Sequence, residues 1–261
     1  MSSVKRFRWS LIFLLAVVAS PLIANAQEAR KDAEPGNPRY SFKREHDFNG
    51  IGKFYMGREI ARVMGFGGVD WLERPQRNSE EDLTLLVRSL GLKPGMRVAD
   101  IGAGSGVISM MMAEQVGETG VILAVDVQIE MLLRLNQNAK RRGISNIIPL
   151  KGTQKSPALG PESVDLIIMV DVYHEFEFPY EMTLEMSQAL RPGGRIAFVE
   201  YRKEDPNVPI KLVHKMTEAQ VKKEASQPEF GLKFKETIGV LPRQHIVIFE
   251  REKREQAATT E

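Results

Sequence analysis

The most informative segment of the chain is Arg97-Val-Ala-Asp-Ile-Gly-Ala-Gly-Ser-Gly-Val-Ile-Ser109. Its short apolar run, 98–101, contains the carboxylate Asp100 and leads directly into three alternating glycines, Gly102, Gly104 and Gly106. An apolar pattern with helical spacing follows, and a buried strand that turns tightly into a helix has this signature. Glycines let a ligand lie against the backbone, and the free N–H groups of the first helical turn face that ligand. We therefore expect a ligand site at this turn.

The chain around the glycine turn alternates apolar runs of strand length with runs of helical periodicity. The expected strands are 97–101, 121–125, 147–150, 163–170 and 196–200, and the helices between them are 107–115, 129–141 and 179–190. Strands and helices at this spacing form βαβ units with a parallel sheet covered on both faces. The sequence thus predicts an α/β fold with a doubly wound, mostly parallel sheet.

The end of this domain breaks the alternation. Thr217 with Gln220 is expected to open a helix that runs to about residue 227. Two further strands, 232–240 and 245–249, are joined by only four residues, and so short a link requires them to be antiparallel. The sequence therefore predicts an antiparallel strand pair at the C-terminal end of the sheet.

The first 26 residues have the features of a signal peptide. Lys5, Arg6 and Arg8 precede an apolar run at 9–19, and Ala24-Asn-Ala26 is a small-x-small cleavage site. The apolar run is shorter than the roughly 20 residues that span a bilayer. We expect cleavage and export to the periplasm or the medium, with no stable membrane span afterwards; the alternative is an uncleaved N-terminal anchor.

Composition narrows the classes of function. The whole chain has 36 Lys and Arg against 34 Asp and Glu, and removal of the first 26 residues leaves 33 against 34, a net charge of −1. No basic stripe interleaved with aromatics is present, so nucleic acid is not an expected partner. The absence of cysteine fits an exported chain and excludes thiol nucleophiles and Cys-ligated zinc. The four histidines, His46, His174, His214 and His245, show no ligand spacing, and no metal site is expected.

Four segments follow from these patterns. Residues 1–26 form the signal peptide, and 27–78 form a polar linker with an aromatic, glycine-rich arm at 48–77 that is expected to be mostly helical and looped. Residues 79–250 form the main domain, with a helix starting at Ser79 and capped by Gly91. Residues 251–261 form a polar tail.

The ligand at the glycine turn is defined by two carboxylates. A dinucleotide-binding turn would place its third glycine at position 107, which is Val107 here. Asp100 before the turn repels a pyrophosphate and attracts an ammonium group. Asp126 ends the second strand, where an acidic side chain accepts hydrogen bonds from ribose hydroxyls. The expected ligand carries a positive group near the turn and a nucleoside further along.

At these residues the chain resembles a known family. Val98-Ala-Asp-Ile-Gly-Ala-Gly-Ser-Gly106 resembles motif I of the class I S-adenosylmethionine-dependent methyltransferases, and Ala124-Val-Asp126 resembles their ribose-binding acid. The resemblance covers about residues 79–250 and implies a Rossmann-like sheet of seven strands. It implies S-adenosylmethionine as the cofactor. The cofactor-binding residues that it implies are Asp100, Gly102, Ala103, Gly104, Ser105, Gly106, Asp126, Val127, Thr153 and Asp171, with Thr153 or Gln154 replacing the family's acidic adenine partner.

The segment Asp171-Val-Tyr-His-Glu-Phe176 follows the fourth strand and should face the reacting methyl group. It lacks the polar-Pro-Pro-aromatic motif of members that methylate DNA bases or protein glutamine, and it resembles small-molecule members, including those acting on quinone precursors. His174 is either a general base or a structural, hydrogen-bonded residue. Tyr173 is a candidate to close over the cofactor. His214 is a candidate in a substrate lid, and specificity is expected in 48–77 and 201–216.

Two hypotheses of different class follow. The first is methyl transfer to a small-molecule or lipid-like acceptor. The second is an exported, non-catalytic protein that uses this fold to bind a ligand or partner, since S-adenosylmethionine is made in the cytoplasm. The intact acid–glycine–acid arrangement of Asp100, 102–106 and Asp126 favours the first.

Overall fold

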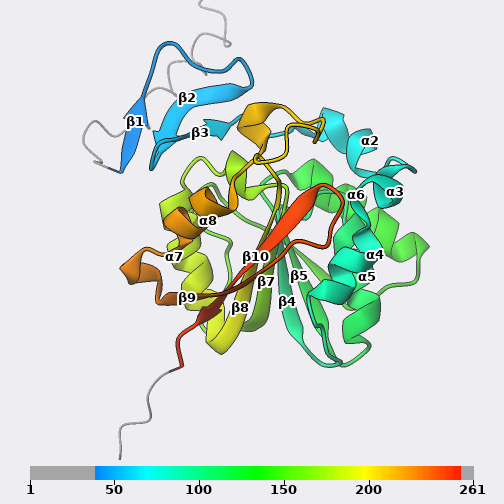
Figure 1. Cartoon of the computed structure of the whole chain (residues 1–261). Helices are drawn as coiled ribbons and strands as arrows, with labels where there is room; N and C mark the ends of the chain where they lie inside the picture. The colour runs from blue at the N-terminus through cyan, green and yellow to red at the C-terminus, as the bar shows by residue number, and fades with distance from the viewer. Residues whose placement is uncertain (1–38, 254–261) are drawn as a thin grey trace, which may run out of the picture. The chain divides into compact units, whose positions relative to one another are not determined.

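The computed structural model describes residues 39–253, and the fold is stated for these residues (Figure 1). The predicted signal peptide and most of the predicted tail lie outside them. Within this range no helix is both long and apolar enough to cross a membrane. The strands are β1 (Tyr40–Phe42), β2 (Gly50–Tyr55), β3 (Arg58–Ala61), β4 (Arg97–Ile101), β5 (Val121–Asp126), β6 (Ile147–Lys151), β7 (Val164–Val170), β8 (Leu190–Tyr201), β9 (Leu232–Ile238) and β10 (Gln244–Arg251). The helices are α2 (Val69–Leu72), α3 (Arg77–Glu81), α4 (Leu83–Ser89), α5 (Val107–Val116), α6 (Ile129–Arg141), α7 (Pro179–Ala189) and α8 (Glu218–Ala225), with 3₁₀ turns η1 (Phe66–Gly68), η2 (Tyr173–Glu175), η3 (Leu212–His214) and η4 (Pro228–Phe230).

Seven strands form the main sheet in the order β6-β5-β4-β7-β8-β10-β9. The five strands from β6 to β8 are parallel, and β10 is antiparallel to both β8 and β9. The predicted α/β class and its antiparallel C-terminal pair are confirmed. The chain winds outward from β4 in one direction and from β7 in the other, so the strand order reverses between β4 and β7. In open α/β sheets ligands bind beyond the carboxyl ends of the strands at such a reversal.

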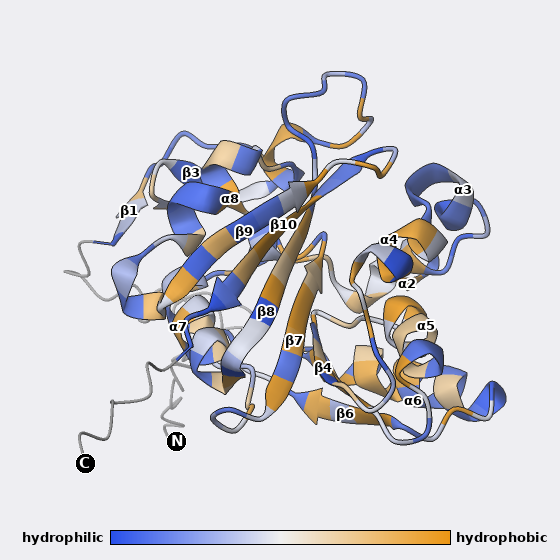
Figure 2. Ribbon diagram, turned by 60° about the horizontal axis from the view of Figure 1, so that its bottom comes forward, coloured by the Kyte–Doolittle hydropathy of each residue, from blue (hydrophilic) through white to orange (hydrophobic). Residues whose placement is uncertain are grey.

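Both faces of the sheet are buried under helices (Figure 2). Alternate residues of one strand point to opposite faces, so in β4 Val98 packs with Leu86 of α4 and Met112 of α5. Its neighbour Ala99 belongs to the opposite core, which includes Met186 of α7. Apolar burial on both faces fixes the register, because a one-residue slip would exchange the two sets of side chains. The carboxyl edge of the sheet is thereby held in place.

The N-terminal arm differs from the prediction of helices and loops. It begins with the strands β2 and β3, which form a three-stranded antiparallel sheet with β1 of the predicted linker, and only η1 and α2 are helical before α3 begins at its end. Tyr55 pairs with Arg58 across a two-residue turn in which Met56 and Gly57 both have positive φ, 50° and 96°. A turn with positive φ at both central residues matches the twist of a hairpin. Gly57 therefore marks the turn of a hairpin between β2 and β3.

Of the two predicted helix N-caps, one is confirmed and one is wrong. Thr217 caps α8 as expected, accepting the Gln220 N–H at 3.1 Å. The predicted cap Ser79 is wrong: it lies inside α3, and Asp82 caps α4 by accepting the Leu85 N–H at 3.0 Å. Asp82 has φ 52°, a left-handed conformation that a short polar side chain tolerates. Gly91 follows α4 with φ 62°, as a C-terminal cap requires.

Candidate active site

The glycine turn joins β4 to α5 at the carboxyl edge of the sheet. Gly102, Gly104 and Gly106 have φ of 72°, 55° and 83°, which L side chains rarely adopt. A Cβ on Gly102 would lie 2.5 Å from the Val172 side chain, and one on Gly104 would lie 2.7 Å from Leu72. The Gly102 N–H donates to the Val125 carbonyl at 2.8 Å, which holds the turn against β5. The turn has no room for side chains.

Asp126, at the end of β5, is hydrogen-bonded to the glycine turn. Its Oδ2 accepts the Gly104 N–H at 2.9 Å and its Oδ1 accepts the Gln128 N–H at 2.8 Å. Burial raises the pKa of Asp126, and these backbone N–H bonds act in the opposite direction. A carboxylate has about four lone-pair sites, more than the backbone N–H groups here occupy, so Asp126 can accept a further hydrogen bond from a ligand.

A cavity of about 780 Å³, including its mouth, opens beside these residues. The predicted residues in its wall are Gly102, Gly104, Asp126, Val127, Thr153 and Asp171. The arm and the opposite wall add Val63, Met64, Leu72, Glu175, Phe176 and Met182. The predicted contribution of the arm to this site has a structural basis in these contacts.

Asp100, Ala103 and Ser105 lie in the wall of a smaller neighbouring cavity of about 320 Å³, which shares Gly102 and Leu72 with the large one. The Ser109 hydroxyl donates to Asp100 at 2.5 Å. Burial raises the pKa of Asp100 to about 6. Gly106 lines neither cavity; its Cα faces Leu135 of α6, where a Cβ would clash at 2.6 Å.

Asp171 and Thr153 reach the cavity in different ways. Asp171 has φ 53°, and its Oδ2 accepts Gln244 Nε2 at 3.1 Å, whereas its buried Oδ1 has no partner. Burial raises the pKa of Asp171 well above its ordinary value. The Thr153 hydroxyl accepts the Ser156 N–H at 2.9 Å, so it is engaged in its own turn. Of the two, Asp171 is the residue that keeps a polar atom without a hydrogen-bond partner.

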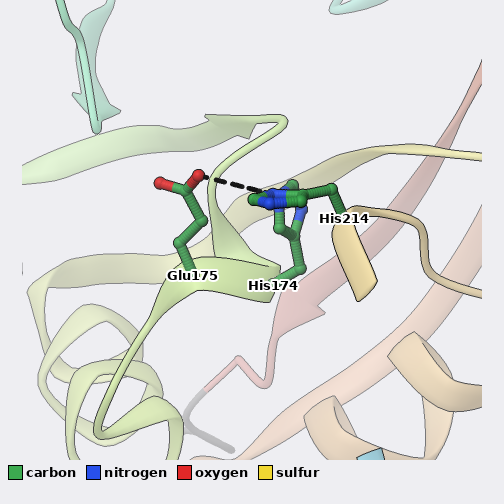
Figure 3. Close-up of side chains that lie close together, drawn as sticks. All are labelled: His174, Glu175 and His214. Carbon is green, nitrogen blue, oxygen red and sulfur yellow. Dashed lines mark hydrogen bonds and ion pairs between the residues drawn. The ribbon is translucent and has the colours of Figure 1, made fainter. Parts of the chain in front are cut away.

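The turn after β7 carries the second group of functional side chains. His174 is buried; its Nδ1 donates to Glu200 Oε2 at 2.6 Å, and its Nε2 lies 3.1 Å from His214 Nδ1. Glu175 Oε1 lies 3.6 Å from His214 Nδ1 and 4.0 Å from His174 Nε2 (Figure 3). We call His174, Glu175 and His214 the histidine cluster. Glu175 is the member that also lines the large cavity.

The charges of the histidine cluster are set by its surroundings. Burial lowers the pKa of His174, but the Glu200 carboxylate raises it by more, so the net pKa is above 6.5. Burial, the neighbouring His174 and Lys211 lower the pKa of His214 to about 4. Burial raises the pKa of Glu175 to about 7.

Tyr173 is not brought to the site. Its ring is fully buried in the core, edge-on to Phe176 and Phe198 at centroid distances of 5.5 and 4.9 Å, and it lines neither cavity. The structure does unite His174 with His214, although their separation in sequence hides the pairing. The expectation that the chain has no metal site relied on the wide spacing of the histidines in the sequence. In space, two of the four histidines, His174 and His214, lie together.

Three acids around the histidine cluster were not singled out from the sequence: Glu175, Glu200 and Glu224. Arg58, on β3, forms a buried ion pair with Glu224 at 2.8 Å and donates to the His174 carbonyl at 3.0 Å. Glu200 could have been identified from the sequence, because it ends a predicted strand as Asp126 does. Glu224 lies in a helix, and no sequence pattern identifies it as a functional residue.

Comparison with known proteins agrees with this geometry. A glycine turn and strand-end acid on a doubly wound sheet define a nucleoside-binding α/β domain. Residues 92–245 match the family model for a methyltransferase domain, and the chain belongs to that family. Its cofactor is S-adenosylmethionine. The solved structure of a SAM-dependent methyltransferase from Aquifex aeolicus superposes with a TM-score of 0.67 at 24% identity, covering 72% of this chain and 100% of that one.

Curated relatives act on different acceptors. A malonyl-[acyl-carrier protein] O-methyltransferase from Methylococcus capsulatus is 34% identical over 53% of this chain and 48% of its own length. A ubiquinone/menaquinone biosynthesis C-methyltransferase from Cupriavidus taiwanensis is 26% identical over 45% of this chain and 48% of its own length. The chain thus spans about half the length of the curated relatives it matches.

The described residues fit the cofactor. The side-chain-free turn at Gly102 and Gly104 accommodates a ligand against the backbone, and Asp126 keeps lone pairs for ribose hydroxyls. The unpaired Oδ1 of Asp171 is a buried acceptor in the cavity wall. All three features lie in the wall of the same cavity.

Proposed function

We propose that this chain transfers the methyl group of S-adenosylmethionine to a small-molecule or lipid-like acceptor. The observation that carries the proposal is the single cavity that has the glycine turn and Asp126 in one wall and Glu175 of the histidine cluster in another. When bound, the cofactor supplies an electrophilic methyl group. Methyl transfer is then mainly a matter of holding two reactants in line.

The chain's own residues divide this task. Gly102, Gly104 and Asp126 hold the cofactor, and Asp171 adds an acceptor for one of its donors. Apolar side chains of the arm and of α7, among them Met64 and Met182, exclude water and suit an acceptor with an apolar body. The buried His174–Glu200 pair fixes the turn that presents Glu175 to the cavity. The two curated relatives support a carbon or oxygen nucleophile on such an acceptor.

Radiolabelled methyl transfer from S-adenosylmethionine to a panel of phenols, quinones, carboxylates and lipids tests the proposal. We expect label in at least one acceptor class and none with Asp126→Asn, while Asp205→Asn behaves as the wild type. Asp205 is the matched control because its Oδ1 also accepts the N–H two residues on, at 2.8 Å. Cofactor binding without transfer to any acceptor would instead favour the non-catalytic binding protein.

A further inference from the structure

Three donor atoms of the histidine cluster converge on one point. His174 Nε2, His214 Nδ1 and Glu175 Oε1 are separated by 3.1, 3.6 and 4.0 Å (Figure 3). Ligands bound to zinc at about 2.0–2.2 Å and at tetrahedral angles lie about 3.3–3.6 Å from one another. The three separations bracket that value, so small side-chain rotations bring all three atoms onto one ion.

Groups around the histidine cluster orient these three atoms so that their lone pairs are available to a cation. Because His174 Nδ1 donates to Glu200, the lone pair of the neutral ring lies on Nε2, toward His214. Histidines that bind metals almost always donate their other ring N–H to a carboxylate or carbonyl in this way. Both oxygens of Glu175 also accept the Met64 N–H, at 3.2 and 3.3 Å, which orients that carboxylate.

Charge balance points in the same direction. Glu175 and Glu200 supply two carboxylates within reach of the histidines, matching a divalent ion. The nearby cation Arg58 is paired with Glu224, which is completely buried, so the charge of Arg58 is already compensated. The side chain of His214 is 21% exposed, which leaves an open side for an exchangeable ligand.

We propose that His174, Glu175 and His214 bind one divalent transition-metal ion of the zinc class. Two imidazoles and one carboxylate with an open fourth position form a donor set typical of catalytic zinc. Since Glu175 lines the cavity, the ion lies at its wall, where it polarises an acceptor oxygen; this role, unlike the binding itself, rests on the proposed methyl transfer.

Isothermal titration of Zn²⁺ into the full chain, purified without a polyhistidine tag and freed of metal with EDTA, tests the site without cofactor or acceptor. We expect one ion per chain. His214→Asn and Glu175→Gln should weaken binding by more than the roughly 10- to 100-fold typical of outer-shell changes. His46→Asn, at a histidine outside the cluster, should bind as the wild type does. Co²⁺ should give the visible absorption of a four-coordinate site in the wild type and lose it in His214→Asn.

No binding by the wild type would overturn the proposal. Binding that His214→Asn and Glu175→Gln leave unchanged would overturn it as well, since the ion would then lie elsewhere. Urea unfolding of each variant establishes that it is folded, and His214, being partly exposed, tolerates replacement best. Because the titration contains no S-adenosylmethionine, failure of methyl transfer leaves its result unaffected.

Discussion

The glycine-turn wall of the cavity and the histidine cluster, which reaches the cavity through Glu175, bring together residues from very different distances along the chain. The glycine-turn wall (Gly102, Gly104 and Asp126) comes from two consecutive strands, and its groups are bonded mainly through the backbone. The histidine cluster needs residues 40 positions apart, and its supports Arg58 and Glu224 are separated by 166. Backbone geometry therefore fixes the glycine-turn wall, whereas long-range packing of charged side chains fixes the histidine cluster.

The largest expected effect is on the support of the histidine cluster. Arg58→Met leaves Glu224 as an unpaired buried carboxylate, and breaking such a pair costs about 3–5 kcal/mol of unfolding free energy. Arg191→Met breaks the exposed pair with Asp165 and should cost less than about 1 kcal/mol. Urea unfolding measures both. Equal losses would break the comparison, because the histidine cluster would not depend on a buried ion pair.

The strand end that leads into the glycine turn should show a pH dependence instead. Burial favours the protonated form of Asp100, whose pKa is about 6 against an ordinary 3.8, so its favourable contribution is complete below pH 3.8 and lost as pH rises through 6. Asp100→Asn should match the wild type near pH 4 and exceed its stability at pH 8 by about 3 kcal/mol, as two pKa units imply.

Urea midpoints at pH 4, 6 and 8 measure this difference. Asp70→Asn, at an exposed carboxylate, is the control. A stability difference for Asp100→Asn that stays constant across this range would show that Asp100 is not held in a desolvated state.

Asp126→Ala tests whether the glycine-turn wall holds the cofactor through hydrogen bonds. The variant removes the acceptor for ribose and for the Gly104 N–H, and S-adenosylmethionine affinity should fall about 100-fold. Calorimetry checks this, with Asp205→Ala as the control. Unchanged affinity for Asp126→Ala would assign cofactor binding to other residues.

The smallest expected effect concerns a positioning residue of the histidine cluster. Glu200→Gln keeps the shape of the side chain but removes the charge beside His174, and Zn²⁺ affinity should fall about tenfold. Glu204→Gln, at an exposed glutamate, should change nothing. Equal Zn²⁺ affinity in Glu200→Gln and the wild type would remove Glu200 from the site.

The same contrast explains how much could be predicted from the sequence. The strands, the glycine turn and Asp126 follow from local patterns, and the structure places Gly102, Gly104 and Asp126 in one cavity wall. The hairpin of β2 and β3 was missed because its turn signal, Met56-Gly57, is weak. His174 and His214 lie close together because η3 packs near η2. No local sequence pattern predicts that contact.

Calorimetric titration of S-adenosylmethionine into the wild-type chain is the most direct test of the central claim, that the glycine-turn wall is a working cofactor site. We expect saturable binding of one molecule per chain in the absence of any acceptor. Absence of saturable binding to the folded chain would contradict it.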